Sequence, residues 1–323
     1  MTPSRFDRIP EIALEWHRAD RAVAIATVAA TWGSAPRPVG SQMVVALDGA
    51  IEGSVSGGCV EAAVVVAAQE AIGQGRPRLL TFGVSSEDAF AAGLACGGEI
   101  TVLVEPVGAQ GAGQGLSPAM LEQIVKARSS RAPLAYRVGV RDWSRQIAVA
   151  DPEDVTGLEG ACFTHLHRPP LRLVIVGAVH VAQALIPMAQ AVGYDIALID
   201  PRSAFATEDR FPGVALHVDF PEDVLPAIGL DAHTALVTLA HDPKIDDPAL
   251  DAALGSEAFY IGSLGSKRTQ AQRLERLAAR GVSAENLSRI HGPVGLDIGA
   301  VGPAEIAVSI LAELVARRRL SRR

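Results

Sequence analysis

Cysteine, aromatic residues and excess positive charge are all scarce in this chain. Its three cysteines, Cys59, Cys96 and Cys162, are scattered and lack zinc-site spacing, so we expect neither a disulfide framework nor a zinc knuckle. Aromatic residues make up only 4% of the chain, and the formal net charge is −7. Such a chain has no overall basic field to attract nucleic acid or anionic lipid, so we expect partners of neither kind.

A long uninterrupted apolar run is also missing. The most apolar segment, residues 171–193, is broken by His180, Gln183, Pro187 and Gln190, so it is not expected to span a membrane. The first residues lack the apolar core that is typical of a signal peptide. We therefore expect a cytoplasmic protein.

The abundant residues indicate an α/β protein. Hydrophobic residues make up 49% of the 323 positions, and alanine, valine, leucine, isoleucine and glycine dominate, as in folds with buried parallel strands. This length suits two domains better than one core. A side-chain-poor stretch at 108–115 and the HRPP segment at 167–170 indicate boundaries. We predict an N-terminal domain over 1–107, a linker and connecting α/β segment over 108–168, and a Rossmann-like domain over 169–323.

From residue 171 onwards, strand-length apolar runs alternate with helical segments. This alternation predicts a doubly wound parallel sheet. The predicted strands lie at 171–177, 194–200, 234–240 and 259–265, and the predicted helices at 179–192, 221–228, 246–254, 266–280 and 303–318.

The N-terminal half has a less regular pattern, in which apolar runs and helical segments are separated by glycine and proline turns. It predicts a mixed α/β domain. The predicted strands lie at 22–30, 42–49, 78–82, 99–107, 134–140, 146–150 and 161–166, and the predicted helices at 10–19, 59–75 and 117–128.

A glycine turn follows the first strand of the C-terminal half. Gly177 ends that strand before a helix, and Asp200 ends the next strand, which is the layout of a Rossmann fold. Val179 and Ala182, however, stand where the fingerprint has its second and third glycines. A valine at the second position obstructs the approach of a pyrophosphate, so the turn predicts the fold but disfavours NAD(P) binding. A turn without any ligand is the alternative.

Further polar residues follow the predicted strands of this half, where parallel strands share one edge at which ligands bind. Together they predict a pocket for an anion, and their irregular spacing makes a metal site the less favoured alternative. The candidates are Gly177, His180, Asp200, Arg202, His241, Ser263, Lys267 and His291.

In the N-terminal half, the stretch GSVSGGCVE places Cys59 between a strand and a helix. A helix start offers free N–H groups and a positive dipole end, which favour a thiolate. Ser54, Ser56, Gly57 and Gly58 could offer backbone N–H groups to an anion at the same place. Cys96 lies in a second glycine-rich loop, ACGGEI.

Cys162 lies inside a strand-like run, so we expect it to be a buried core residue. No histidine lies near Cys59 or Cys96 in the sequence, so nothing local supports a Cys–His hydrolase. A thiol-dependent hydrolase or transferase that uses Cys59 is therefore the least favoured of the functional alternatives.

The chain resembles the XdhC/CoxI family, the accessory factors of xanthine dehydrogenase and related molybdenum hydroxylases. The resemblance covers nearly the whole chain in the family's order. It is carried by ATVAATWGSAPRPVGSQMVV, GSVSGGCVE, CGGEI, VIVGAVHVA, LIDPR, YIGSLGSKR and IHGPVGLDIGAVGPAEIAVSILAEL. The family usually has glycine at the position of Val179, so this chain departs from the pattern there.

The resemblance implies a binding protein rather than a turnover enzyme. It would hold the molybdenum cofactor (molybdopterin) while a cysteine desulfurase replaces an oxo ligand with sulfur, and would then deliver it to apo xanthine dehydrogenase. The family's cysteines fall on Cys59 and Cys96, and cofactor-biosynthesis proteins are implied as further partners. The Cys59 sulfur would touch molybdenum or the dithiolene side, since soft sulfur suits this metal.

Several alternatives stay open at this point. An NAD(P)-dependent oxidoreductase built on the C-terminal half competes with the cofactor chaperone. The cofactor could bind in the N-terminal loops, at the C-terminal strand edge or between the two domains, and we favour the last because ligands often bind at domain interfaces. A chain rich in alanine and valine also often forms homo-oligomers.

Overall fold

The computed structural model describes residues 8–33, 35, 37–83, 98–108, 114–151 and 153–320. The described chain divides into two compact units, one ending at Pro169 and the other beginning at Pro170. We call them the N-terminal and the C-terminal unit. Within the described residues, no helix has both the length and the apolar character needed to cross a membrane.

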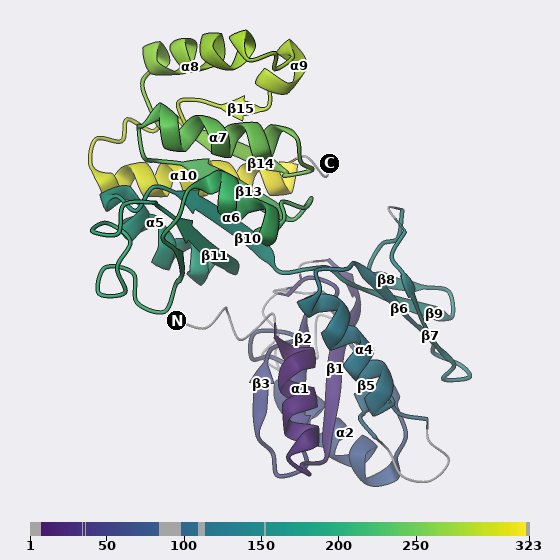
Figure 1. Cartoon of the computed structure of the whole chain (residues 1–323). Helices are drawn as coiled ribbons and strands as arrows, with labels where there is room; N and C mark the ends of the chain where they lie inside the picture. Colours follow the sequence, from purple (N-terminus) through teal and green to yellow (C-terminus); the bar gives the residue numbers. More distant parts are fainter. Residues whose placement is uncertain are drawn as a thin grey trace. The chain divides into compact units, whose positions relative to one another are not determined.

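An antiparallel five-stranded sheet forms the centre of the N-terminal unit, with the order β3-β2-β1-β5-β4 (Figure 1). Its strands are β1 (Val23–Trp32), β2 (Gln42–Ala46), β3 (Ile51–Gly53), β4 (Arg78–Phe82) and β5 (Glu99–Pro106). Helix α2 (Glu61–Gln74) packs on one face, whereas α1 (Ile9–Arg18) and α4 (Pro118–Ser129) pack on the other. Both faces are therefore covered, which explains why β1 is buried over most of its length.

A second antiparallel sheet, of order β7-β6-β9-β8, belongs to the same unit. Its strands are β6 (Leu134–Gly139), β7 (Arg145–Val149), β8 (Gly157–Glu159) and β9 (Cys162–His167). Tyr136, Val138 and Phe163 join this sheet to the core around α1 and α4. The expectation of a buried Cys162 was wrong, because this residue is the first of β9 and its side chain is exposed.

The C-terminal unit is a parallel six-stranded sheet with the order β12-β11-β10-β13-β14-β15. Its strands are β10 (Leu171–Val176), β11 (Tyr194–Ile199), β12 (Ala215–His217), β13 (Thr234–Thr238), β14 (Tyr260–Ser263) and β15 (Ile290–His291). Successive strands build outward from β10 in one direction and then, from β13, in the other. This is the doubly wound arrangement that the alternating pattern predicted.

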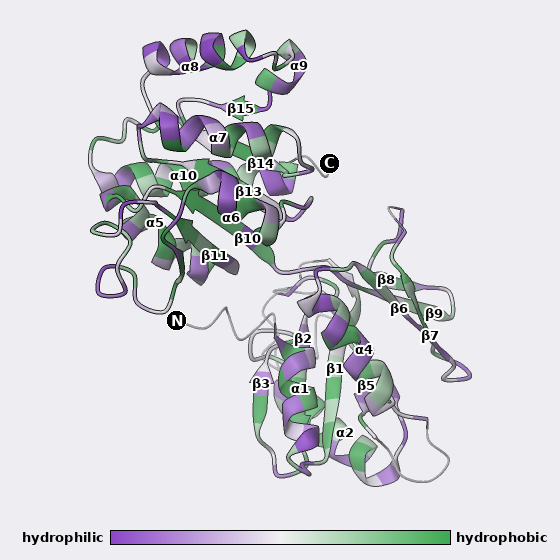
Figure 2. Cartoon of the chain, in the orientation of Figure 1, coloured by the Kyte–Doolittle hydropathy of each residue, from purple (hydrophilic) through white to green (hydrophobic). Residues whose placement is uncertain are grey.

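Helices cover both faces of this sheet, as a doubly wound fold requires. On one face lie α5 (His180–Ala191) and α10 (Pro303–Leu320), and on the other α6 (Pro221–Ile228), α7 (Pro243–Leu254) and α8 (Lys267–Ala279), followed by α9 (Ala284–Leu287). Figure 2 shows the central strand β10 as mostly hydrophobic and α8 as largely hydrophilic. The fold thus presents the carboxyl ends of all six parallel strands at one edge of the sheet.

Candidate functional site

The turn around Cys59 joins β3 to α2, as predicted from GSVSGGCVE. Gly57 and Gly58 have φ values of 78° and 122°, in the left-handed region that favours glycine. The helix begins at Glu61, two residues beyond Cys59. The two glycines therefore let the chain reverse sharply just before the cysteine.

The carboxylate of Glu61 folds back over this turn, and both of its oxygens accept hydrogen bonds. Its Oε1 accepts from the Ser54 hydroxyl at 2.7 Å, the Ser56 N–H at 2.9 Å and the Gly57 N–H at 3.0 Å. Its Oε2 accepts from the Gly58 N–H at 2.8 Å and from the Ser56 hydroxyl. Five donors thus converge on one side chain of the chain itself.

Partial burial would raise the pKa of Glu61, but the hydrogen bonds from Ser56 and Ser54 outweigh it and lower this pKa to about 2. Glu61 is consequently ionised at neutral pH. The N–H groups of Ser56, Gly57 and Gly58, expected to be open to an anion of the cofactor, are engaged by this carboxylate. The N–H of Ser54 donates to the Gln42 carbonyl at 3.1 Å.

Cys59 itself is solvent-exposed, and its thiol is free. It is flanked by buried residues, since Val55 and Val60 are at most 5% exposed. The thiol is accordingly presented at the surface by a turn anchored at both ends. Cys96, the other cysteine predicted to bind cofactor, lies outside the described residues.

In the C-terminal unit, Gly177 directly follows β10 and has a φ of 112°. A Cβ at this position would lie 2.6 Å from the Ala240 backbone nitrogen, so only glycine fits between the turn and the end of β13. Val179 precedes α5 as its N-cap residue, and His180 is the first helical residue and exposed. The predicted glycine turn is present, and its glycine is required by the close approach to β13.

Asp200 is fully buried, and both its oxygens are occupied. Its Oδ2 accepts from the Ala178 N–H at 2.7 Å, and Arg202 donates to both oxygens through its guanidinium, at 2.7 and 2.8 Å. Burial would raise the pKa of Asp200, but the hydrogen bonds from Arg202 and from the Ala178 N–H outweigh it and lower this pKa. In a dinucleotide-binding fold, the carboxylate at this position is directed at ribose hydroxyls. In this protein it ties the glycine turn to the next strand.

The other predicted residues at this sheet edge differ in accessibility. His241 follows β13 and is exposed, with a φ of 61°, and Lys267 is the exposed first residue of α8. Ser263, in contrast, is fully buried, and its hydroxyl is 2.5 Å from that of Thr238. Its side chain therefore links two neighbouring strands in the sheet.

His291 lies against Glu313, with 2.9 Å between Nδ1 and Oε1. Its ring stacks on Tyr260 at a centroid distance of 4.7 Å, and the Tyr260 hydroxyl donates to Glu313 at 2.6 Å. Burial opposes ionisation of Glu313, but the hydrogen bonds from His291 and Tyr260 lower its pKa to about 2. This network joins the end of β15 to α10.

The parallel sheet brings the C-terminal candidates to one edge, but only some of them face solvent. His180, His241 and Lys267 are exposed, whereas Asp200 and Ser263 are buried. Among the residues that the structure describes, no cluster of three or more histidine, cysteine or acidic side chains could hold a metal ion.

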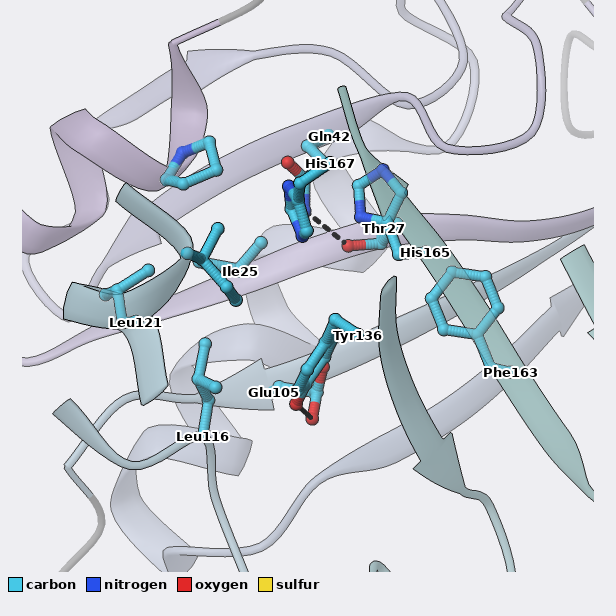
Figure 3. Close-up of a pocket in the computed structure, with 12 residues that line it drawn as sticks. Ile25, Thr27, Gln42, Glu105, Leu116, Leu121, Tyr136, Phe163, His165 and His167 are labelled. Carbon is cyan, nitrogen blue, oxygen red and sulfur yellow. Dashed lines mark hydrogen bonds between the residues drawn. The ribbon is translucent and has the colours of Figure 1, made fainter. Parts of the chain in front are cut away.

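The sequence reasoning missed a buried polar cluster in the N-terminal unit (Figure 3). His165 and His167 are buried on the same face of β9, with ring centroids 4.3 Å apart. Burial lowers the pKa of His165 to about 4 and that of His167 well below its ordinary value. The two rings line a cavity of about 10 Å³, enough for roughly one water molecule.

Glu105 and Tyr136 line the same cavity (Figure 3). Arg145 forms a salt bridge with Glu105. The Tyr136 hydroxyl and the Arg145 Nε each donate to Glu105 Oε1 at 2.9 Å. The sequence did indicate part of this cluster. Glu105 interrupts an apolar strand, and His165 and His167 follow Phe163 at a spacing of two residues, which places all three on the inward side of β9. Tyr136 gave no comparable sign.

A second buried acid was missed in the C-terminal unit. Asp246, in the first turn of α7, is 3% exposed, and its Oδ1 accepts from the Ala240 N–H at 3.3 Å. Burial raises its pKa to about 7, against the opposing charge of Arg273. Because aspartate is common near helix starts, the sequence gave no reason to single it out.

Known proteins match this chain over nearly its whole length. Residues 16–83 match the XdhC and CoxI family, and residues 173–314 match the XdhC Rossmann domain. The molybdenum cofactor insertion chaperone PaoD of Escherichia coli is 34% identical over 311 residues, which cover 96% of this chain and 88% of that protein. The chain belongs to the XdhC and CoxI family.

Two further matches agree with this membership. A probable xanthine dehydrogenase subunit of Bacillus subtilis is 28% identical, over 91% of this chain and 93% of that protein. A crystal structure described as a xanthine dehydrogenase from Bacillus halodurans is 26% identical with a TM-score of 0.79, and the match covers 98% of this chain and 97% of that one. The family resemblance carried by the motifs is thereby confirmed.

The two family matches include some of the candidate residues and leave others out. The turn with Cys59 and Glu61 lies within the XdhC and CoxI match, and the C-terminal strand edge lies within the XdhC Rossmann match. The buried histidines of β9 lie between these two ranges.

Proposed function

We propose that this protein binds the molybdenum cofactor as cargo and acts as an insertion chaperone rather than a turnover enzyme. The observation that carries the proposal is the near full-length similarity to a protein named as a molybdenum cofactor insertion chaperone. In this proposal, the cofactor is held while a cysteine desulfurase supplies sulfur, and it is then delivered to an apo xanthine dehydrogenase. Cofactor-biosynthesis proteins supply the cargo.

Cys59 is the principal cofactor contact in this proposal. Its free, exposed thiol is a soft ligand, suited to the metal or to the sulfur-rich side of the pterin. A chaperone must also release its cargo, and a surface thiol on a glycine turn meets that need better than an enclosed cage. The exposed His180, His241 and Lys267 remain candidate partners for the phosphate of the pterin.

Replacing Cys59 with alanine is expected to leave the fold intact and to remove most of the bound molybdopterin, because the exposed thiol contributes little to packing. Wild-type protein and variant would be purified from a host that makes the cofactor. Bound pterin would be quantified by fluorescence after oxidation and identified by mass spectrometry.

Cys162 offers a matched control, since it is also a free, exposed cysteine in the same unit. Cys162→Ala should retain molybdopterin at the wild-type level. Wild-type protein that carries no pterin from such a host would refute the chaperone proposal. Equal retention in Cys59→Ala and wild type would refute only the role of Cys59.

A further inference from the structure

Glu61 organises the segment that carries Cys59 through a closed hydrogen-bond network. The hydroxyls of Ser54 and Ser56 not only donate to Glu61 but also accept hydrogen bonds. The Ser54 hydroxyl accepts from the Gly57 N–H at 2.9 Å, and the Ser56 hydroxyl accepts from the Val60 N–H at 3.0 Å. Each serine therefore links the Glu61 carboxylate to the backbone of the turn.

The conformation that this network stabilises costs a free chain conformational entropy. Two consecutive residues, Gly57 and Gly58, have left-handed φ values, and a Cβ at Gly58 would meet nothing within 4 Å. Packing therefore does not hold Gly58 in place. Because glycine loses the most conformational freedom on folding, such a turn needs specific bonds to stay ordered. The N–H groups of both glycines supply these bonds by donating to Glu61.

The arrangement also decides what the start of α2 can bind. A carboxylate at this position is favourable because it meets unpaired N–H groups and the positive end of the helix dipole. Since Glu61 already fills this place, a phosphate of the cargo has no free donors among Ser56, Gly57 and Gly58. The donors before α2 are therefore taken by a group of the chain itself.

We propose that Glu61 is the positioning residue for Cys59, and that its carboxylate holds the turn in the one conformation that presents the thiol to the cofactor. This inference rests on the proposed function for the role of Cys59 as a cofactor contact. Placement of the thiol by Glu61 can be measured without the cofactor, so the two proposals can fail separately.

The test uses the full-length chain with Cys96→Ser and Cys162→Ser, which leaves Cys59 as the only thiol. In this background the rate of Cys59 alkylation by iodoacetamide at fixed pH is measured for Glu61→Gln and Glu61→Ala. The amount of molybdopterin retained is measured for the same two substitutions in the chain that keeps all three cysteines. Glutamine keeps the shape of the side chain, but its NH2 group is itself a donor and would face the N–H and O–H donors of the turn. We expect the alkylation rate to change severalfold and retention to fall about tenfold in both variants.

Glu70→Gln is the matched control, because Glu70 lies on the same helix but is exposed and pairs with Arg78. It should change neither measurement. Formate added to Glu61→Ala should restore the alkylation rate by filling the vacated place, and chloride at equal ionic strength should not. Such rescue would not follow if Glu61 acted only through the stability of α2.

Wild-type alkylation rates in both Glu61 variants would overturn the inference. So would wild-type pterin retention in both. Far-UV circular dichroism checks folding, and Glu61→Gln decides the question if Glu61→Ala does not fold. If wild-type protein holds no molybdopterin while the Glu61 variants still alter thiol reactivity, the chaperone proposal fails and the placement of Cys59 by Glu61 stands.

Discussion

Gly177 and Glu61 show how single residues can have roles other than those their motifs suggest. Gly177 belongs to a glycine turn that binds phosphate in dinucleotide-binding folds, yet here it lets the chain pass the backbone after β13. Glu61 is the last residue of GSVSGGCVE, and its carboxylate occupies the donors that the rest of that motif offered. At Glu61, a group of the chain takes the place that a ligand was expected to fill, and at Gly177 the glycine is required by packing.

Gly177→Ala is expected to destabilise the C-terminal unit by about 3 kcal/mol or more, since the added Cβ meets backbone atoms that no rotamer change can move. The measurement is urea-induced unfolding followed by far-UV circular dichroism.

Gly229→Ala provides the comparison, because Gly229 has a φ of 68° but open space around its Cβ position. Gly229→Ala should lower the free energy of unfolding only by the cost of the left-handed conformation, about 1 kcal/mol. Equal destabilisation in the two variants would show that the approach to Ala240 does not matter.

At the scale of elements, strand β9 carries two buried imidazoles whose protonation opposes folding. In the unfolded chain, a histidine titrates near its ordinary pKa of 6.5, whereas burial lowers the pKa of His165 to about 4. Between these values the unfolded state binds more protons than the folded state. The contribution of His165 to the free energy of unfolding is therefore fully present above pH 6.5 and is lost as the pH falls toward 4.

We predict that the N-terminal unit loses about 2 kcal/mol of stability between pH 7 and pH 5 through His165, and more through His167. Trp16, Trp32 and Trp143, the three tryptophans of the chain, all lie in this unit, so tryptophan fluorescence during urea unfolding reports on it alone. The double variant His165→Gln/His167→Gln should lose most of this pH dependence.

His180→Gln serves as a control, because His180 is exposed and lies in the other unit. It should leave the fluorescence-detected pH dependence unchanged. A double variant that unfolds with the same pH dependence as the wild type would show that the buried imidazoles do not cause it.

At the scale of the whole molecule, each unit has its own hydrophobic cores. The two clusters of the C-terminal unit contain only residues between Leu171 and Leu314, one on each face of the parallel sheet. The two clusters of the N-terminal unit contain no residue beyond Phe163. The apolar burial that stabilises each unit is thus supplied from within it.

Residues 170–323 produced alone are therefore expected to fold and to unfold in one cooperative thermal transition, monitored by circular dichroism. A fragment of residues 203–323 lacks β10 and β11 and should stay unfolded, since the sheet has lost its central strand. A 170–323 fragment without a cooperative transition would contradict the independence of the unit.

Much of the architecture could be predicted from local patterns. Strand–helix alternation after residue 171 identified the parallel sheet, and Gly75, at 64° in φ, caps α2 at the end predicted for the helix over 59–75. Short edge strands such as β12 and β15 were not predicted. Their pairing depends on partners distant in the sequence, and three or two residues carry no periodic pattern.

The sequence by itself determined the two α/β units, the glycine turns and the place of Cys59 between a strand and a helix. These follow from backbone preferences and from hydrophobic spacing, which act over a few residues. Only the tertiary structure decided which polar groups are open to a ligand. Glu61, Asp200 and Ser263 are each occupied by partners within the chain, and such pairing depends on where the packed fold brings side chains together.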